Sequence, residues 1–384
     1  MPLAELIMPD APPHYGASRP FEAPVVANVV LTGPGARNEK RHIEVDLRGS
    51  GLSYSAGDAL AIVPRNDPRL VETVLTVLGI DGHAEVRVGG GRMRFAQALA
   101  TQFEIAVATP RFLNLWAKLS GSTELRALAA PEKTEARRGF LRAYHIQDIV
   151  RGWPVEGLAA EAVVAGLRPL QPRLCSIASS PAVDPARAAI TLATLDYSLR
   201  GEQRLGVVTG YMAPQARPGT TLPVFVQPEP RFRLRLQGDI VMIGAGTGVA
   251  PFRAFVAERR ARTSAGRAWL VFGARSRRDD FIYADQWDAA IEDGTLTRLD
   301  LAFSQDIAGK VYVQHRLLEH AAELYAWIEN GASIYVCGDA AGMAPAVHAA
   351  LLEIIAHEGR TSPEEAAACL RHLARDGRYC RSIY

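Results

Sequence analysis

Several features that mark other classes of protein are missing from this chain of 384 residues. Its four cysteines include no CxxC pair and no metal-ligand spacing, which favours a reduced, cytoplasmic protein without a metal site. No apolar run approaches the roughly 18 residues of a membrane span, and the N-terminus has neither the basic flank nor the apolar core of a secretory signal. The formal net charge of +2 is too small to indicate nucleic acid. We therefore expect a cytoplasmic protein that binds neither nucleic acid nor membrane.

The hydrophobic pattern divides the chain into three parts after a Pro-rich lead-in over residues 1–20. Strand-like alternation begins at residue 21 and resumes at 173, with helical patterns at about 66–167 between them. From residue 236, short buried strands alternate with helices, which is typical of a doubly wound parallel sheet. Three further segments are each predicted as one element: strands over 186–197 and 231–237, and a helix over 315–331.

One stretch near the middle joins a single arginine to several hydroxyls: Arg173-Leu174-Cys175-Ser176, followed by Ile-Ala-Ser-Ser. An arginine can hold a phosphate through two charge-assisted hydrogen bonds, and a nearby serine can donate to a ring heteroatom. As a strand, the stretch would place Arg173 and Cys175 on one face and Leu174 and Ser176 on the other. A basic strand end followed by a serine turn fits the same residues, so both interpretations stay open.

A glycine-rich loop, residues 244–248 (GAGTG), lies between an expected strand and an expected helix. Backbone amides and the helix dipole favour a diphosphate there, although a tight structural turn is the alternative. The loop after a later strand holds the hydroxyl of Ser304, the ammonium of Lys310 and the phenol of Tyr312. Such a set suits an adenosine 2′-phosphate, or it is an ordinary polar loop.

Two residues near the C-terminus are also candidates. Cys337 ends an expected parallel strand, where a thiol could lie beside a nicotinamide ring or be a small buried hydrophobe. Tyr384 is the last residue, and its ring could stack on a flat cofactor or belong to a tail packed on the surface.

Taken in order, the motifs resemble one family. RLCSIASS, GVVTGYM, MIGAGTGVAPFRAF, AFS…KVYVQHRL, YVCGDA and a terminal RY…Y are similar to the FAD/NADP(H)-binding half of the diflavin reductases, in the ferredoxin-NADP reductase superfamily. The nearest resemblance is to the flavoprotein alpha subunit of assimilatory NADPH–sulfite reductase. Members of that family normally carry an FMN domain in front, and we expect this chain to lack it.

The resemblance implies a fold of two domains. A β-barrel FAD-binding domain is expected over 21–235, with a helical insertion at about 66–167. An α/β doubly wound, parallel-sheet NADP(H)-binding domain is expected over 236–384.

The resemblance also assigns roles to residues. Arg173 would hold the FAD diphosphate, and Ser176 would hydrogen-bond near the reactive N5 of the flavin. Tyr384 would stack on the flavin face that accepts hydride, while Thr247 and Cys337 would flank the nicotinamide. The expected catalytic residues are therefore Ser176, Cys337 and Tyr384. The other expected cofactor contacts are Thr109, Ala143, Leu174, Cys175, Thr191, Leu192, Ala193, Tyr197, Gly206, Val207, Val208, Thr209, Gly246, Ser304, Gln305, Lys310, Val311, Tyr312, Val313 and Gln314.

Four positions depart from the pattern of that family. Cys175 stands where a tyrosine usually packs against the isoalloxazine, which should loosen or re-tune the flavin. Gln305 replaces an arginine that would bind the 2′-phosphate, which bears on the preference for NADPH over NADH. Ala346 replaces an aspartate, and Ser382 replaces another that would assist hydride transfer.

The resemblance implies an NADPH-dependent FAD oxidoreductase that passes electrons from NADPH through FAD to a separate carrier. A flavodoxin, a ferredoxin or the haemoprotein (beta) subunit of a sulfite reductase would serve as that carrier. One alternative is a reductase for another acceptor, such as assimilatory nitrate reductase or free flavin. Another is a non-catalytic subunit that only binds flavin.

Overall fold

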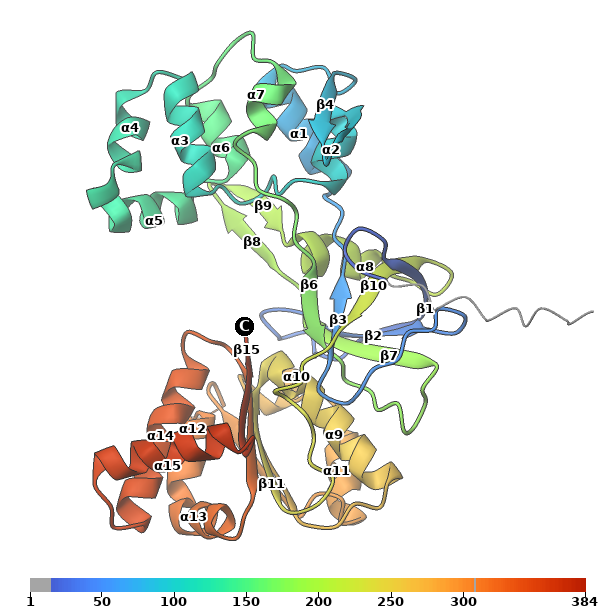
Figure 1. Ribbon diagram of the computed structural model, residues 1–384, viewed down its shortest axis with the longest axis vertical. Helices are drawn as coiled ribbons and strands as arrows, with labels where there is room; N and C mark the ends of the chain where they lie inside the picture. The colour runs from blue at the N-terminus through green and yellow to red at the C-terminus, as the bar shows by residue number, and fades with distance from the viewer. Residues whose placement is uncertain (1–14, 307–308) are drawn as a thin grey trace, which may run out of the picture. The chain divides into compact units, whose positions relative to one another are not determined.

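The computed structural model describes residues 15–306 and 309–384 (Figure 1). The chain forms two compact units. Unit 1 combines the described part of Met1–Ile62 with Leu174–Ala193 and Ala216–Tyr384, and unit 2 combines Val63–Arg173 with Thr194–Gln215. The two units are defined by how the chain packs and not by what each part binds. The cofactor-binding domains expected over 21–235 and 236–384 therefore remain a proposal. Within the described residues, every helix is too short or too polar to cross a membrane.

The first sheet has six strands in the order β6-β3-β10-β1-β2-β7. Antiparallel pairing joins β1 to β2 and β10, β2 to β7, and β10 to β3. The strands are β1 (Phe21–Val30), β2 (Lys40–Asp46), β3 (Ala59–Ile62), β6 (Arg173–Ser176), β7 (Arg187–Ala193) and β10 (Thr221–Gln227). One bridge, Ile177 to Ile190, links the residue after β6 to β7. No closed sheet is found among the described residues, so the expected barrel is seen as a six-stranded sheet.

The second sheet of unit 1 has five parallel strands in the order β13-β12-β11-β14-β15. They are β11 (Ile240–Ala245), β12 (Ala268–Ala274), β13 (Arg298–Phe303), β14 (Ser333–Gly338) and β15 (Tyr379–Ile383). The predicted parallel sheet is confirmed, and the end of the chain adds a strand to it that the sequence pattern did not reveal.

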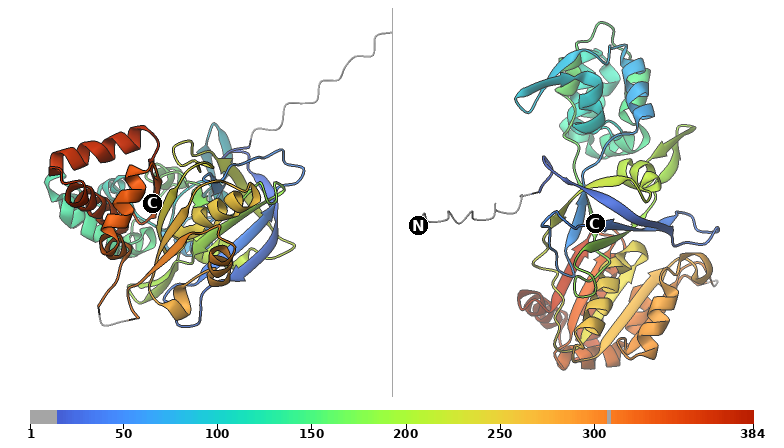
Figure 2. Two further views of the ribbon diagram at one scale, coloured as in Figure 1. Left: turned by 90° about the horizontal axis from the view of Figure 1, so that it is seen from below. Right: turned by 90° about the vertical axis from the view of Figure 1, so that its right-hand side faces the viewer.

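Helices cover both faces of this parallel sheet (Figures 1 and 2). They are α9 (Ala250–Ala261), α10 (Arg277–Asp280), α11 (Ala284–Glu292), α12 (Val313–Glu319), α13 (Ala321–Glu329), α14 (Met343–Glu358) and α15 (Pro363–Arg375). Alternate residues of β11 enter different cores: Val241 and Ile243 pack with α12–α15, whereas Ile240 and Met242 pack with α9 and α11. Burial on both faces explains why these strands are continuous apolar runs.

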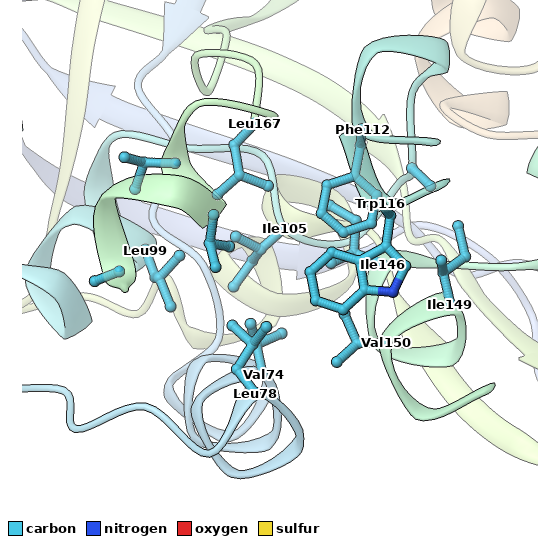
Figure 3. Close-up of a cluster of buried hydrophobic side chains, with 14 of the residues drawn as sticks. Val74, Leu78, Leu99, Ile105, Phe112, Trp116, Ile146, Ile149, Val150 and Leu167 are labelled. Atoms are coloured by element: carbon cyan, nitrogen blue, oxygen red, sulfur yellow. The ribbon is translucent and has the colours of Figure 1, made fainter. Parts of the chain in front are cut away.

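Unit 2 contains the helices predicted for the insertion, together with two small hairpins. Its first helix is α1 (Pro68–Leu78), in which the Asp67 side chain caps the start by accepting the N–H of Arg69 and Gly79, with φ 64°, is the C-cap. An aspartate cap, a proline in the first turn and a glycine after the last turn are the usual signals for the start and end of a helix. The core is drawn in Figure 3, where Phe112 and Trp116 stack at 5.5 Å between ring centroids.

The remaining helices of unit 2 are α2 (Phe95–Thr101), α3 (Pro110–Leu119), α4 (Thr123–Ala129), α5 (Thr134–Ala143), α6 (Ile146–Gly152), α7 (Ala160–Val164) and α8 (Ala213–Gln215), with a 3-10 turn η1 (Pro131–Lys133) and a π-helical turn η2 (Val207–Met212). The hairpins pair β4 (Glu85–Val88) with β5 (Gly91–Arg94) and β8 (Asp196–Leu199) with β9 (Glu202–Leu205).

Three predicted elements are wrong. Residues 231–237 are not a strand, because the hydroxyl of Tyr335 donates to the carbonyl of Arg233 and accepts the N–H of Arg235 in place of a neighbouring strand. Residues 186–197 divide into β7 and β8, since β8 pairs with β9 instead of joining the first sheet. The helix over 315–331 divides into α12 and α13 at His320, whose φ and ψ of −114° and 32° leave the helical region.

Candidate cofactor-binding sites

The glycine loop at the carboxyl edge of β11 serves two purposes. After Ala245 the chain makes one 3-10 turn, η3 (Gly246–Val249), and then enters α9. An added Cβ at Gly248 would overlap the carbonyl oxygen of Cys337, so this glycine lets η3 pack against β14. Gly246 has φ 57°, and its Cβ position meets only the Cε of Lys40, at 4.0 Å. The structural-turn interpretation therefore explains Gly248, while Gly246 leaves space for a ligand.

A cavity of about 760 Å³ opens beside this loop. It brings together eight of the expected cofactor contacts, Ala193, Gly246, Thr247, Ser304, Tyr312, Val313, Gln314 and Tyr384, and Ala346 also lines it. The cavity lies at the carboxyl ends of the parallel strands, where sheets of this kind bind ligands, and its volume is within the usual range for a cofactor pocket. Gln305, Lys310 and Val311 are not part of its lining.

Sequence reasoning missed several other residues of this lining, among them Lys40, Arg275 and Asp280. Arg275 directly follows β12, so the rule that ligands bind at carboxyl edges was a usable signal. Lys40 and Asp280 form a buried ion pair across 240 residues of sequence, for which no local signal exists.

A thiol and two hydroxyls lie together beside the cavity. β14 and β15 place Cys337 opposite Ser382, and the hydroxyls of Ser382 and Ser176 are both close enough to the thiol to act on its pKa. Burial raises the pKa of the Cys337 thiol to about 12, although the two hydroxyls lower it slightly, so the thiol is neutral at physiological pH. The structure thus unites two of the expected catalytic residues, Ser176 and Cys337, with the serine that replaces an aspartate.

Tyr384 is tied down at the end of the chain. Its N–H donates to the carbonyl of Gly338 (3.2 Å), and its own carbonyl accepts the N–H of Ala340 (2.9 Å). The phenol oxygen lies 2.8 Å from the hydroxyl oxygen of Thr247, while the residue as a whole is 62% exposed. An exposed ring with an anchored backbone and hydroxyl is suited to covering a flat cofactor.

The expected FAD contacts that belong to unit 1 differ in the chemical groups that they offer to a ligand. Burial raises the pKa of Cys175 to about 12, so this cysteine is not a reactive thiolate. Leu174 is 60% exposed. The hydroxyl of Thr191 lies 2.7 Å from that of Tyr283, and Leu192 is buried, so these two residues have only backbone groups to offer a ligand.

The contacts expected from unit 2 include a phosphate cradle at η2. Gly206 precedes this turn, and the first backbone hydrogen bond is made by the N–H of Gly210 to the carbonyl of Gly206 (2.8 Å). The amides of Val207, Val208 and Thr209 come before that bond, which leaves them able to donate to a diphosphate. The backbone here fits the group that the resemblance assigned to it.

Four other expected residues of unit 2 have structural partners. Arg173 donates to Glu104 (3.1 Å) and to the carbonyl of Gln171 (2.8 Å), which leaves further guanidinium donors for a phosphate. The hydroxyl of Tyr197 lies 3.0 Å from Nε2 of His145. Thr109 caps α3 by accepting the N–H of Phe112, and Ala143 is the last residue of α5.

Comparisons with known proteins agree with this geometry. The family described as FAD binding domain matches residues 13–211, and the one described as oxidoreductase NAD-binding domain matches residues 242–349. The chain is 41% identical over 374 residues to the sulfite reductase [NADPH] flavoprotein alpha-component of Bacillus subtilis (strain 168), covering 96% of this chain and 62% of that protein. Identity to the protein of the same name from Vibrio cholerae is 39% over 373 residues, with 97% and 60% covered.

The chain therefore spans roughly three fifths of the length of these relatives. The matches confirm the resemblance on which the sequence interpretation rested. The chain belongs to the FAD binding domain family and continues into a nucleotide-binding region of the oxidoreductase NAD-binding type.

Proposed function

We propose that this protein is an NADPH-dependent FAD oxidoreductase that passes electrons from NADPH through FAD to a separate acceptor. The observation that supports this most strongly is the cavity at the carboxyl edge of the parallel sheet, lined by Thr247, Ser304, Tyr312 and Tyr384. It offers a glycine turn for a diphosphate, polar side chains for a ribose phosphate and an aromatic terminus for a flat ring.

The residues of the chain bind and orient, since a bound FAD would itself supply the uptake of hydride and the release of single electrons. Cys337 stays neutral because of its burial, and together with Ser176 it positions the two rings. Tyr384 shields the site, and a single side-chain hydrogen bond to Thr247 holds its phenol there. Such a bond contributes only about 1 kcal/mol, so the ring can move aside when a nicotinamide enters.

The assignments for FAD also belong to this proposal. Arg173 and the amides of residues 207–209 would hold the diphosphate, and Ser176 would contact the flavin. The FAD-binding domain would extend over 21–235 as a barrel that the Ile177–Ile190 bridge closes, and the NADP(H)-binding domain over 236–384. We place the protein in the cytoplasm.

For the acceptor, we propose the haemoprotein subunit of a sulfite reductase, or a flavodoxin or ferredoxin. The support is the name of the relatives, which are sulfite reductase flavoprotein alpha-components.

Anaerobic reduction tests the proposal. The purified yellow protein should bleach rapidly with NADPH, because hydride passes to FAD. Reduced protein should then be reoxidised by one of the proposed acceptors and not by the others. A yellow protein that NADPH leaves unbleached would be a flavin-binding subunit without turnover, and the proposed activity would be wrong.

A further inference from the structure

The start of the loop after β13 lacks positive charge, because Lys310, the cation of this loop, comes five residues after Gln305. Gln305 is neutral, and Asp306, which follows it, adds a negative charge that would repel a phosphate. A cation from another segment, placed beside Gln305, would compensate for both and add to the charge of Lys310.

The segment after β12 supplies unpaired positive charge. Arg275, Arg277 and Arg278 lie within four residues, and none of them makes an ion pair in the described part of the chain. The two carboxylates that follow are engaged elsewhere: Asp279 accepts the N–H of Gly35 (3.2 Å), and Asp280 pairs with Lys40.

Backbone contacts hold this arginine segment beside the loop. The N–H of Gln305 donates to the carbonyl of Arg275 (2.8 Å). The N–H of Arg277 donates to the carboxylate of Asp306 (2.8 Å), on the other side of Gln305. Arg277 is thus fastened next to the position from which the arginine is missing.

The side chain of Arg277 is also oriented. Its guanidinium carbon lies 5.2 Å from the ring centroid of Phe303, the residue before Ser304, and 5.8 Å from that of Phe281. Contact with the aromatic rings steadies an exposed arginine while its in-plane donors remain free for a bidentate phosphate contact. The neighbouring Arg278 makes no such ring contact within the described residues, which makes it a matched control.

We propose that Arg277 binds the 2′-phosphate of the adenosine in place of the arginine missing at position 305, and so selects NADP(H) over NAD(H). The inference rests on the proposed function, because it takes the cavity to bind a nicotinamide nucleotide. It adds the residue that recognises the 2′-phosphate.

Calorimetric titration with two adenosine fragments tests this without any turnover. 2′,5′-ADP and 5′-ADP differ only in the 2′-phosphate, and the unaltered protein should bind the first more tightly. Arg277→Ala should weaken 2′,5′-ADP at least about tenfold, the effect of one lost charge-assisted bond, and leave 5′-ADP unchanged. Arg278→Ala should change neither affinity. Equal losses in the two variants, or no loss in Arg277→Ala, would overturn the assignment.

A second variant checks the site of the phosphate. Gln305→Arg in the Arg277→Ala background should restore the preference for 2′,5′-ADP, because it returns a guanidinium to the same loop. Failure of this rescue would place the phosphate elsewhere. Tight but equal binding of both fragments by the unaltered protein would refute the role of Arg277 and keep the proposed function, whereas no binding of either would overturn both.

Discussion

At the scale of single residues, Cys337 and Ser382 lie opposite each other on neighbouring strands, and this pair bears on hydride transfer in the proposed reaction. The two residues are register partners on β14 and β15, and the Ser382 hydroxyl acts to lower the pKa of the thiol. A serine hydroxyl is neutral, so it stabilises positive charge on a nearby nicotinamide less than a carboxylate at the same position would.

We predict that Ser382→Asp accelerates the reduction of FAD by NADPH about tenfold. A carboxylate makes a charge-assisted bond, which is worth roughly 1–1.5 kcal/mol more than a neutral one. Stopped-flow bleaching under anaerobic conditions measures the rate. Ser382→Ala, which adds no charge, should not accelerate it. An aspartate variant no faster than the unaltered protein would contradict the prediction.

Tyr384 leads to a second prediction at this scale. Deleting it should raise kcat/KM for NADH, because a nucleotide that binds weakly no longer competes with the terminal ring for the flavin face. Steady-state kinetics with NADH give the readout. Thr247→Val keeps the ring but removes its 2.8 Å contact with the phenol, and it should act in the same direction with a smaller effect. Unchanged NADH kinetics in the truncated protein would count against gating by Tyr384.

At the scale of secondary-structure elements, residues 231–237 show how a strand pattern can lack a strand. Phe232 is fully buried, as the alternation predicts, but the neighbouring backbone is bound to the Tyr335 hydroxyl. The alternation of apolar and polar residues indicates which side chains are buried. A strand also needs a neighbouring strand whose backbone pairs with its own.

Tyr335→Phe should therefore lower the free energy of unfolding by about 1–3 kcal/mol, since a carbonyl and an N–H each lose their partner. Urea denaturation provides the comparison. Tyr144→Phe is the matched control, because the Tyr144 hydroxyl makes no hydrogen bond within the described residues, and it should change stability little. If the two variants lose the same stability, the Tyr335 hydroxyl does not hold this segment.

At the scale of the whole molecule, one polar network in unit 1 joins the six-stranded sheet to the start of α11. The phenol of Tyr283, just before α11, lies 3.0 Å from Nδ1 of His42 on β2 and 2.7 Å from the hydroxyl of Thr191 on β7. Burial lowers the pKa of His42 to about 4; the charge of Arg253 lowers it further, while Glu44 opposes the shift. His42 is thus neutral in the folded protein.

This network predicts a loss of stability in mild acid. An unfolded chain protonates His42 near pH 6.5, but the folded protein does so only near pH 4. The stability is therefore intact above pH 6.5 and falls as the pH drops toward 4. Between pH 7.5 and pH 5 the loss should be about 2 kcal/mol. Urea denaturation at both values measures it, and His42→Gln should remove most of this difference. An equally large difference in the variant would assign it to other groups.

The amino-acid sequence by itself determined the order and type of most elements, the parallel sheet and the positions of the glycine loop and the serine-tyrosine loop. These depend on periodicity, capping and turn residues, which are local properties of the chain. The same reasoning placed Ser304 and Tyr312 at one edge of a sheet, because the carboxyl ends of parallel strands meet there.

Only the tertiary structure decided which of those residues meet and what surrounds them. It paired Lys40 with Asp280, turned the C-terminal tail into β15, and set Arg277 against Phe303 beside Gln305. It also separated Gly248, which packs against β14, from Gly246, which faces the cavity. Each of these depends on contacts between segments far apart in the chain, and no local pattern encodes such contacts.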